Sequence, residues 1–178
     1  MPLLLVEGPR KSGKSYLISK QDTLPVYKFP FNENFSEWGF DKNGTSIHWF
    51  GLGKEIMLHE LDVAGFIPKM LVDRGILTNS VWGVFQKRIS KEQAKSDLIK
   101  FYNRGLFEHT EIILVEGLFN EVRKKDIWDI DDNRREEEYS LFQSFSLLLS
   151  DLGVTINTFH NNFDNESINQ FNKVINNF

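Results

Sequence analysis

An eight-residue segment near the amino terminus, Gly8-Pro9-Arg10-Lys11-Ser12-Gly13-Lys14-Ser15, constrains the fold more than any other feature of the chain. It matches the pattern G-x-x-x-x-G-K-[ST] at every fixed position. An apolar run over residues 3–6 precedes it, and a stretch compatible with a helix begins at about Lys14. A strand followed by a glycine-rich loop that opens a helix predicts a loop whose backbone N–H groups bind phosphate.

The residue types of this loop indicate a nucleoside triphosphate as its ligand. Lys14 is expected to reach the outer phosphates, and Ser15 is expected to bind Mg²⁺, the cofactor that accompanies ATP as phosphoryl donor. The amino terminus of the following helix adds partial positive charge. The alternative interpretation is a surface turn that is rich in glycine, serine and lysine. The predicted phosphate-binding residues are Gly8, Lys11, Ser12, Gly13, Lys14, Ser15 and Tyr16.

Short apolar runs alternate with longer segments of helical period along the whole chain. The runs predict strands over residues 3–6, 26–29, 70–72, 112–115 and 154–159. The intervening segments predict helices from residue 14 and over residues 49–65, 90–105, 136–152 and 166–177. Five strands that alternate with helices predict an α/β fold of three layers, a parallel sheet with helices on both faces. A length of 178 residues suits a single domain.

Local signals add detail to two helices and one connection. The helix over 49–65 is predicted from its apolar residues, which are Phe50, Met57, Leu61 and Ala64. The helix over 90–105 begins with Ser90 as N-cap and with Gln93 in the position of a capping box. The polar, glycine-containing stretch over 32–46 predicts a loop.

Composition excludes several classes of function. The chain has no cysteine, which removes disulfides, zinc–thiolate sites and thiol nucleophiles. A net charge of −4 argues against stable non-specific binding to DNA. The longest apolar runs are far too short to span a membrane, so no membrane partner is expected and a cytoplasmic protein is the simplest account. The four histidines show no metal-ligand spacing.

A second polar pair follows the third predicted strand. The apolar run Met70-Leu71-Val72 ends in Asp73 and Arg74, which therefore fall at the carboxyl edge of a parallel sheet, where ligands bind. Asp73 can order Mg²⁺ or accept a proton, and the planar fork of Arg74 can clamp a phosphate. The alternative is an ordinary ion pair at the surface. Glu116 ends the fourth predicted strand at the same edge.

Several segments together resemble one known family. Residues 73–82, Asp-Arg-Gly-Ile-Leu-Thr-Asn-Ser-Val-Trp, resemble the thymidylate kinase signature D-R-Y-x-x-S-x-x-A-[YF]. Tyr27-Lys28-Phe29-Pro30 is similar to the family's [RK]-F-P segment, and Glu7-Gly8 is similar to the pair that precedes its phosphate loop. Glu121-Val122 resembles the stretch that leads into its lid. The chain thus resembles the thymidylate kinase-like family of P-loop kinases, which act on deoxynucleoside monophosphates.

The resemblance implies ATP-dependent phosphoryl transfer to a nucleoside monophosphate, either dTMP or another deoxynucleotide. Arg74 would hold the acceptor phosphate, while Phe29 and Trp82 would line the base pocket. Lys11 would replace a catalytic arginine of one subtype. A lid over about residues 118–136 would close on the transferring phosphoryl group. The implied catalytic residues are Lys14, Lys11, Asp73, Arg74 and the lid candidates Arg123, Arg134 and Arg135, and the implied metal ligands are Ser15 and Asp73.

Departures from the family pattern leave the acceptor open. Arg10 occupies the position of an aspartate that touches the acceptor sugar, and Gly75 replaces the tyrosine after Asp-Arg. Because arginine only donates hydrogen bonds, Arg10 either favours an acceptor with additional negative charge or pairs with a surface carboxylate. A 5′-end polynucleotide kinase, the one alternative with a nucleic-acid partner, and a P-loop NTPase subunit that acts as a switch remain as other functions. The sequence also leaves the oligomeric state open, including a homodimer.

Overall fold

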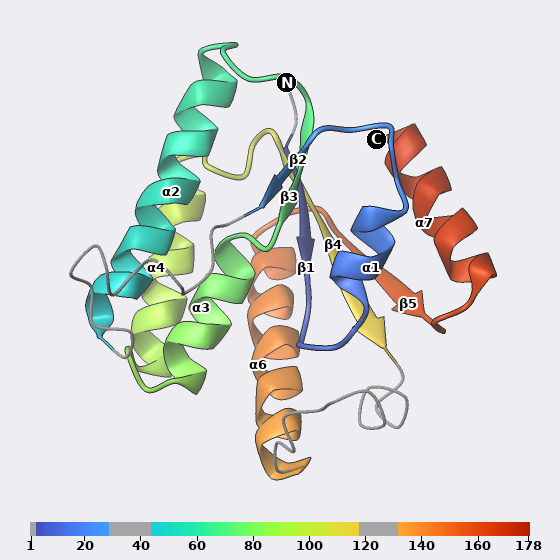
Figure 1. Cartoon of the computed structure of the whole chain (residues 1–178). Helices are drawn as coiled ribbons and strands as arrows, with labels where there is room; N and C mark the ends of the chain where they lie inside the picture. The colour runs from blue at the N-terminus through green and yellow to red at the C-terminus, as the bar shows by residue number, and fades with distance from the viewer. Residues whose placement is uncertain (1–2, 29–43, 118–131) are drawn as a thin grey trace.

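The computed structural model describes residues 3–28, 44–117 and 132–178, and these residues form a parallel sheet between two layers of helices (Figure 1). The five strands lie in the order β2-β3-β1-β4-β5, and all pairs are parallel. They are β1 (Leu3–Glu7), β2 (Val26–Lys28), β3 (Met70–Asp73), β4 (Thr110–Gly117) and β5 (Ile156–Asn161). The predicted three-layer α/β fold is therefore confirmed.

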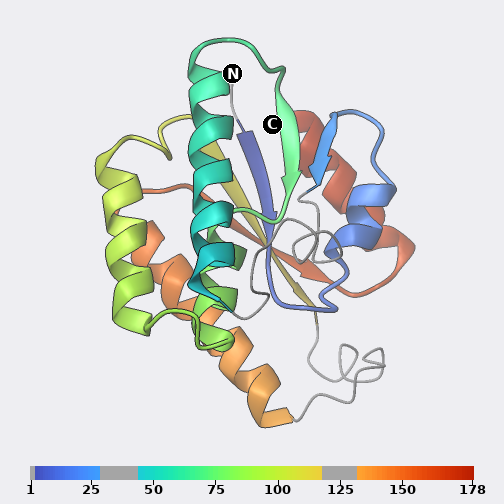
Figure 2. The same cartoon turned by 60° about the vertical axis from the view of Figure 1, so that its left-hand side comes forward.

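The helices divide between the two faces of the sheet, as Figure 2 shows from a second direction. One face carries α1 (Lys14–Ser19) and α7 (Asn165–Asn177). The opposite face carries α2 (Thr45–Val63), α3 (Ile76–Phe85), α4 (Lys91–Asn103) and α6 (Asp132–Asp151). In the described part of the chain, no helix is both long enough and apolar enough to cross a bilayer.

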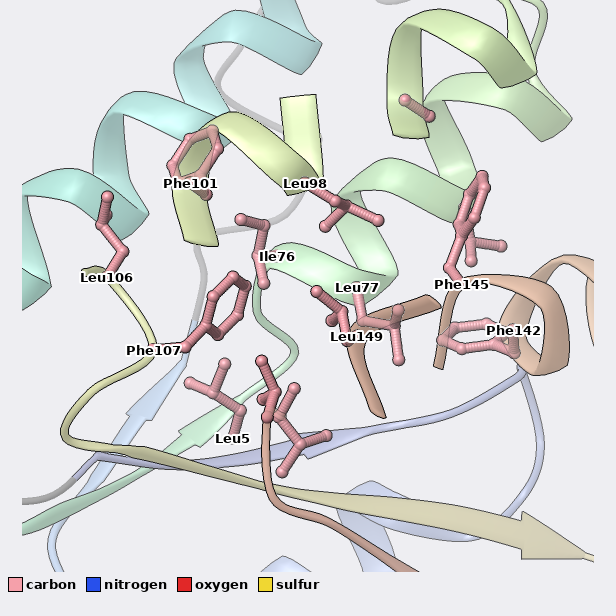
Figure 3. Packing of buried hydrophobic residues seen from close by; sticks show 14 of the residues in the cluster. Leu5, Ile76, Leu77, Leu98, Phe101, Leu106, Phe107, Phe142, Phe145 and Leu149 are labelled. Carbon is pink, nitrogen blue, oxygen red and sulfur yellow. The ribbon is translucent and has the colours of Figure 1, made fainter. Parts of the chain in front are cut away.

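The alternating direction of the side chains along β1 explains why helices cover both faces of the sheet. Successive side chains of a strand point to opposite faces, so Leu3 and Leu5 join the larger core cluster, with α2, α3, α4 and α6. Leu4 and Val6 join the smaller cluster, with α1 and α7. Figure 3 shows the larger cluster, in which Leu5 lies below the side chains of α3 and α6. Each fully buried leucine contributes about 1.5–3 kcal/mol to folding.

The carboxyl ends of the strands position the polar residues that matter below. Val6 lies opposite Asp73 of β3, and Glu7 lies opposite Leu114 of β4. The β1–α1 loop, the end of β3 and the end of β5 therefore share one edge of the sheet. In parallel α/β sheets this is the edge at which ligands bind.

Two strands differ from the prediction at both ends, and β1 ends one residue later than predicted, at Glu7. β4 begins two residues earlier than predicted, at Thr110, and extends to Gly117, so Glu116 is its penultimate residue rather than its end. β5 begins and ends two residues later than predicted, which places Asn161 inside the strand. The other three strands begin at the predicted residues, although Phe29, at the predicted end of the second strand, lies outside the described residues.

The helix predicted over 49–65 is present as α2, but the apolar residues that indicated it do not form its buried face. Phe50 and Met57 are 36% and 48% exposed, and Ala64 follows the helix as an exposed C-cap. The buried face includes Ile47, His48, Leu52, Lys54, Glu55, Leu58 and Asp62. An apolar stripe cannot identify this face, because about half of its positions are polar or charged. The helix also begins at Thr45, inside the stretch predicted as loop, whose residues 32–43 lie outside the described part of the chain.

Three further helices refine the predictions. The N-cap of α4 is confirmed, since the Ser90 side chain accepts a hydrogen bond from the Gln93 N–H at 3.0 Å. The capping box is incomplete, because the Gln93 side chain donates to Asp97 at 2.8 Å instead. Helix α3 was not predicted, and α6 begins four residues earlier than predicted.

Candidate active site

The segment between β1 and α1 adopts the backbone that its glycines predict. Gly8 and Gly13 have φ angles of 136° and 88°, which side chains rarely allow. A Cβ on Gly8 would lie 2.2 Å from the carbonyl oxygen of Val115, so β4 also requires glycine there. Lys11 has a positive φ of 61° although it carries a side chain. The strain at Lys11 persists only where surrounding structure supports it, as at ligand-binding loops.

Lys14 is turned into the loop. Its side chain donates hydrogen bonds to the carbonyl oxygens of Gly8 and Pro9, both at 2.6 Å, and to the Ser12 hydroxyl at 3.2 Å. Burial and, next, the nearby charge of Arg74 lower the pKa of Lys14 to about 7. The ammonium group is thus held at the centre of the loop, where a phosphate oxygen can replace the carbonyl groups. Ser15 and Tyr16 lie exposed on the first turn of α1.

Asp73 and Arg74 lie beside this loop. The Arg74 N–H donates to the carbonyl oxygen of Val6 at 3.1 Å, which continues the pairing of β1 with β3 past the end of the strand. Arg74 has a positive φ of 71°. Asp73 is 8% exposed, and its Oδ1 atom is buried without a hydrogen-bond partner. The alternative of an ordinary pair at the surface is therefore wrong for Asp73, because its carboxylate lies buried at the edge of the sheet.

The donor set beside the loop fits a magnesium ion. Mg²⁺ takes oxygen ligands, usually one or two carboxylates together with substrate phosphates. The orphaned Oδ1 of Asp73 and the exposed hydroxyl of Ser15 are oxygen donors of this kind. The described residues contain no cluster of three histidine, aspartate or glutamate side chains that could hold a metal alone. A metal here would therefore depend on phosphate oxygens.

Glu7 connects the two segments of the site. Its carboxylate accepts hydrogen bonds from the N–H groups of Gly75 and Leu77 at 3.0 Å, and from the N–H and hydroxyl of Thr78. Burial raises the pKa of Glu7, and these hydrogen bonds oppose the rise. A Cβ on Gly75 would lie 2.9 Å from Leu5 and 3.0 Å from Glu7, so there is no space for the tyrosine of the family pattern.

The side chain of Arg10, within the loop, contacts Glu138 of α6 and the aromatic rings of Trp82 and Phe85 in α3. Its backbone N–H and its Nε both donate to the Glu138 carboxylate at 3.0 Å. Its guanidinium lies 4.6 Å from the centre of the Trp82 ring and 5.0 Å from that of Phe85. Glu138 is 2% exposed, so the partner of Arg10 is a buried carboxylate of α6 and not the surface carboxylate of the alternative. The Nη2 atom of Arg10 is buried without a hydrogen-bond partner.

The predicted lid arginines fall into two groups. Arg134 and Arg135 lie in the first turns of α6 rather than in a loop, and the Arg134 guanidinium lies 4.4 Å from the centre of the Phe85 ring. Arg134 therefore meets the same aromatic side chain as Arg10, whereas Arg135 is buried. Arg123, Phe29 and the lid over 118–131 lie outside the described residues.

Sequence reasoning missed several polar residues at this edge. Lys54 and Glu55 of α2 form a buried ion pair at 2.7 Å, and Lys54 also donates to the Arg74 carbonyl oxygen at 3.5 Å. Glu138 and Asn161 contact the loop from α6 and β5. Asn161 carries a usable signal, a polar residue at a strand end, but the fifth strand was predicted to end at residue 159. Nothing local distinguishes Glu138 from the neighbouring exposed Glu136 and Glu137.

The fold and this edge define a P-loop kinase architecture, and comparison of whole structures supports the assignment of fold. A scan against protein-family models found no match, and a search among curated proteins found no relative. The thymidylate kinase from Candida albicans is similar, with a TM-score of 0.66 at 15% identity over 99% of this chain and 91% of that chain.

Two further solved structures share this fold. The deoxyadenosine kinase from M. mycoides with bound dCTP has a TM-score of 0.61 at 13% identity, over 99% of this chain and 100% of that chain. The YorR protein from Bacillus subtilis, in complex with phosphorylated GDP, has a TM-score of 0.62 at 14% identity, over 97% and 93%. The chain therefore has the fold of the P-loop nucleoside and nucleotide kinases.

Proposed function

We propose that this protein is a kinase that transfers the terminal phosphoryl group of ATP to a nucleoside monophosphate, with a deoxynucleotide as the favoured acceptor. The observation that carries the proposal is that two basic residues lie at one edge of the sheet. Lys14 is turned into the loop after β1, and the N–H of Arg74, which follows β3, donates to the carbonyl oxygen of Val6 in β1. The enzymes of similar fold, which include a thymidylate kinase, agree with a nucleotide substrate.

On the donor side, the loop would wrap around the triphosphate of ATP. Lys14 would exchange its bonds with Gly8 and Pro9 for phosphate oxygens, because a charge-assisted bond to phosphate is stronger than a bond to a neutral carbonyl. Ser15 and Asp73 would hold Mg²⁺, which supplies charge neutralisation for phosphoryl transfer. Lys11, held at a positive φ on the rim of the loop, would add charge next to the transferring group.

On the acceptor side, Arg74 would bind the phosphate of the nucleotide. A guanidinium offers two parallel donors to a phosphate, which fixes the distance and orientation of the acceptor. Trp82 would contribute to the wall of the acceptor site, where it already carries Arg10 on its ring. Arg134 lies in α6 one turn before Glu138, and its guanidinium contacts the Phe85 ring, as that of Arg10 does. It would add positive charge beside the bound acceptor. This concentration of cations favours an acceptor that carries a phosphate over a neutral nucleoside.

The test is a panel of acceptors with γ-labelled ATP and Mg²⁺. We expect label on a deoxynucleoside monophosphate, and little on the matching nucleoside or on an oligonucleotide with a 5′-hydroxyl end. Lys14→Ala should abolish transfer in a protein that melts like the wild type. Lys20→Ala, at the other end of α1, is the matched control and should transfer normally.

Each other outcome has a definite meaning. Label on the oligonucleotide alone would replace the proposal with a 5′-end polynucleotide kinase. Release of labelled phosphate with no acceptor labelled would indicate an NTPase that acts as a switch. Transfer that survives in folded Lys14→Ala would refute the assignment of the phosphate loop.

A further inference from the structure

The side chain of Asn161, the last residue of β5, contacts the phosphate loop from a distant part of the chain. Its Nδ2 donates a hydrogen bond to the carbonyl oxygen of Ser12 at 2.8 Å. Asn161 is 1% exposed, and the end of β5 lies at the same edge of the sheet as the loop (Figure 2). This contact is independent of the loop motif, which concerns residues 8–15 alone.

The amide of Asn161 is fixed in one orientation. Its Oδ1 accepts a hydrogen bond from the Phe163 N–H at 2.9 Å, which leaves Nδ2 to face Ser12. The turn that follows is attached to α7, because the Asn162 N–H donates to the Ser167 hydroxyl at 3.0 Å. Ser167 N–H in turn donates to the Asp164 side chain at 2.7 Å. Because Oδ1 is fixed by Phe163, Nδ2 can hold the Ser12 carbonyl oxygen in one position.

The partner is one peptide plane of the phosphate loop. In a trans peptide the carbonyl oxygen and the following N–H point in opposite directions. Fixing the Ser12 oxygen toward β5 therefore directs the Gly13 N–H away from β5. Gly13 must also be glycine for this contact, since a Cβ there would lie 2.1 Å from Nδ2 of Asn161.

We propose that Asn161 is a positioning residue that orients the Ser12–Gly13 peptide so that the Gly13 N–H points to the phosphates of the bound triphosphate. This inference rests on the proposed function, because it takes a triphosphate as the ligand of the loop. Asn161 itself touches no reacting atom. Asn161 should therefore affect the binding of the donor's phosphates, but not the binding of the donor's base or of the acceptor.

The test replaces the donating amide with a group that only accepts. Asn161→Asp keeps the size of the side chain and the oxygen that accepts from the Phe163 N–H. It replaces the donating Nδ2 with a carboxylate oxygen, which repels the Ser12 carbonyl oxygen. We expect the Kd for MgATP and the Kd for magnesium tripolyphosphate, which lacks a nucleoside, to rise together by about tenfold or more. The KM for the acceptor should change by less than about twofold.

Gln21→Glu is the matched control. Gln21 also donates through its amide to a backbone carbonyl, that of Leu24 at 3.0 Å, and accepts from backbone N–H groups, but it follows α1 at the end remote from the loop. Its substitution should lower the melting temperature without changing either Kd. If Asn161→Asp does not fold, Asn161→Ala is measured by the same criterion.

The outcomes separate the two proposals. An unchanged Kd for tripolyphosphate in a folded Asn161 variant would overturn the inference while the proposed function stands. An equal rise in the Gln21→Glu control would also overturn it, because the effect would then be general loss of stability. A wild-type protein that binds neither MgATP nor tripolyphosphate would overturn the proposed function together with the inference.

Discussion

If the loop binds MgATP as proposed, the protonation of Lys14 should change on binding. Its folded pKa of about 7 lies below the ordinary value of 10.5, so in the free protein it loses its proton between neutral and alkaline pH. A triphosphate beside the amine favours the charged form and raises the pKa again. Binding must therefore be accompanied by proton uptake at any pH between the two pKa values.

The expected result is uptake of about one proton per MgATP at pH 8 and almost none at pH 6. The apparent affinity should accordingly fall by up to about tenfold per pH unit above pH 7. Titration calorimetry at each pH, in two buffers of different ionisation enthalpy, measures the uptake. Lys14→Arg is the control, since its guanidinium stays protonated throughout. Equal binding enthalpies in both buffers at pH 8 would contradict the environment described for Lys14.

Arg10 and Glu138 form a pair that the loop and α6 share. Glu138 is almost fully buried, and Arg10 is about three-quarters buried, so either charge alone would be costly. We expect Arg10→Met and Glu138→Leu each to lower the free energy of unfolding by about 1–3 kcal/mol, the cost of leaving a buried hydrogen-bonding group without its partner. The double variant should be less destabilised than the sum by at least about 1 kcal/mol, measured by chemical denaturation. Strict additivity would show that the two charges do not interact.

The ion pair with Glu138 leaves Nη2 of Arg10 without a hydrogen-bond partner, so this atom can affect which acceptor is preferred. If Nη2 of Arg10 reaches an acceptor oxygen, Arg10→Met should reduce the preference for a 3′-phosphorylated nucleotide over plain dTMP. The measurement is the ratio of kcat/KM for the two acceptors in wild type and variant. Arg10→Asp is a poorer choice, because it would place a second carboxylate beside buried Glu138.

Helix α3 depends on a cap that comes from β1. Glu7 is buried and receives four donors from the first turn of α3, whose own N-cap, Gly75, has no side chain. Glu7→Gln replaces one accepting oxygen with an NH₂ group that faces the Thr78 N–H. We expect a loss of about 2–3 kcal/mol in the free energy of unfolding, since hydrogen bonds to charged groups contribute about that much.

Glu92→Gln controls for acidic residues in first turns generally. Glu92 lies exposed in the first turn of α4, so its substitution should change stability by less than about 0.5 kcal/mol. Urea denaturation of the two variants and the wild type makes the comparison. If Glu7→Gln unfolds at the wild-type midpoint, the cap from β1 contributes nothing to the stability of the fold.

At the scale of the whole molecule, the sequence predicts the features that depend on short stretches of the chain. The sheet follows from continuous apolar runs, and the loop from a motif within eight residues. The contacts of Glu7 with Thr78 and of Arg10 with Glu138 join residues far apart in the sequence, up to 128 positions for the second pair. No periodicity encodes such pairs. The same limit applies to the buried face of α2, where the ion pair of Lys54 and Glu55 takes the place of apolar residues.

The structure brings the loop around Lys14 and Arg74 together at one edge of the sheet. The central claim of the proposed function is that the loop binds ATP and that Arg74 binds the acceptor. The measurement is the steady-state kinetics of Arg74→Ala with its Kd for MgATP. We expect kcat/KM for the nucleoside monophosphate to fall by about 30- to 150-fold, the loss of a bidentate phosphate contact, with the Kd for MgATP nearly unchanged. Equal losses for MgATP and the monophosphate, or no loss for the monophosphate, would contradict the account.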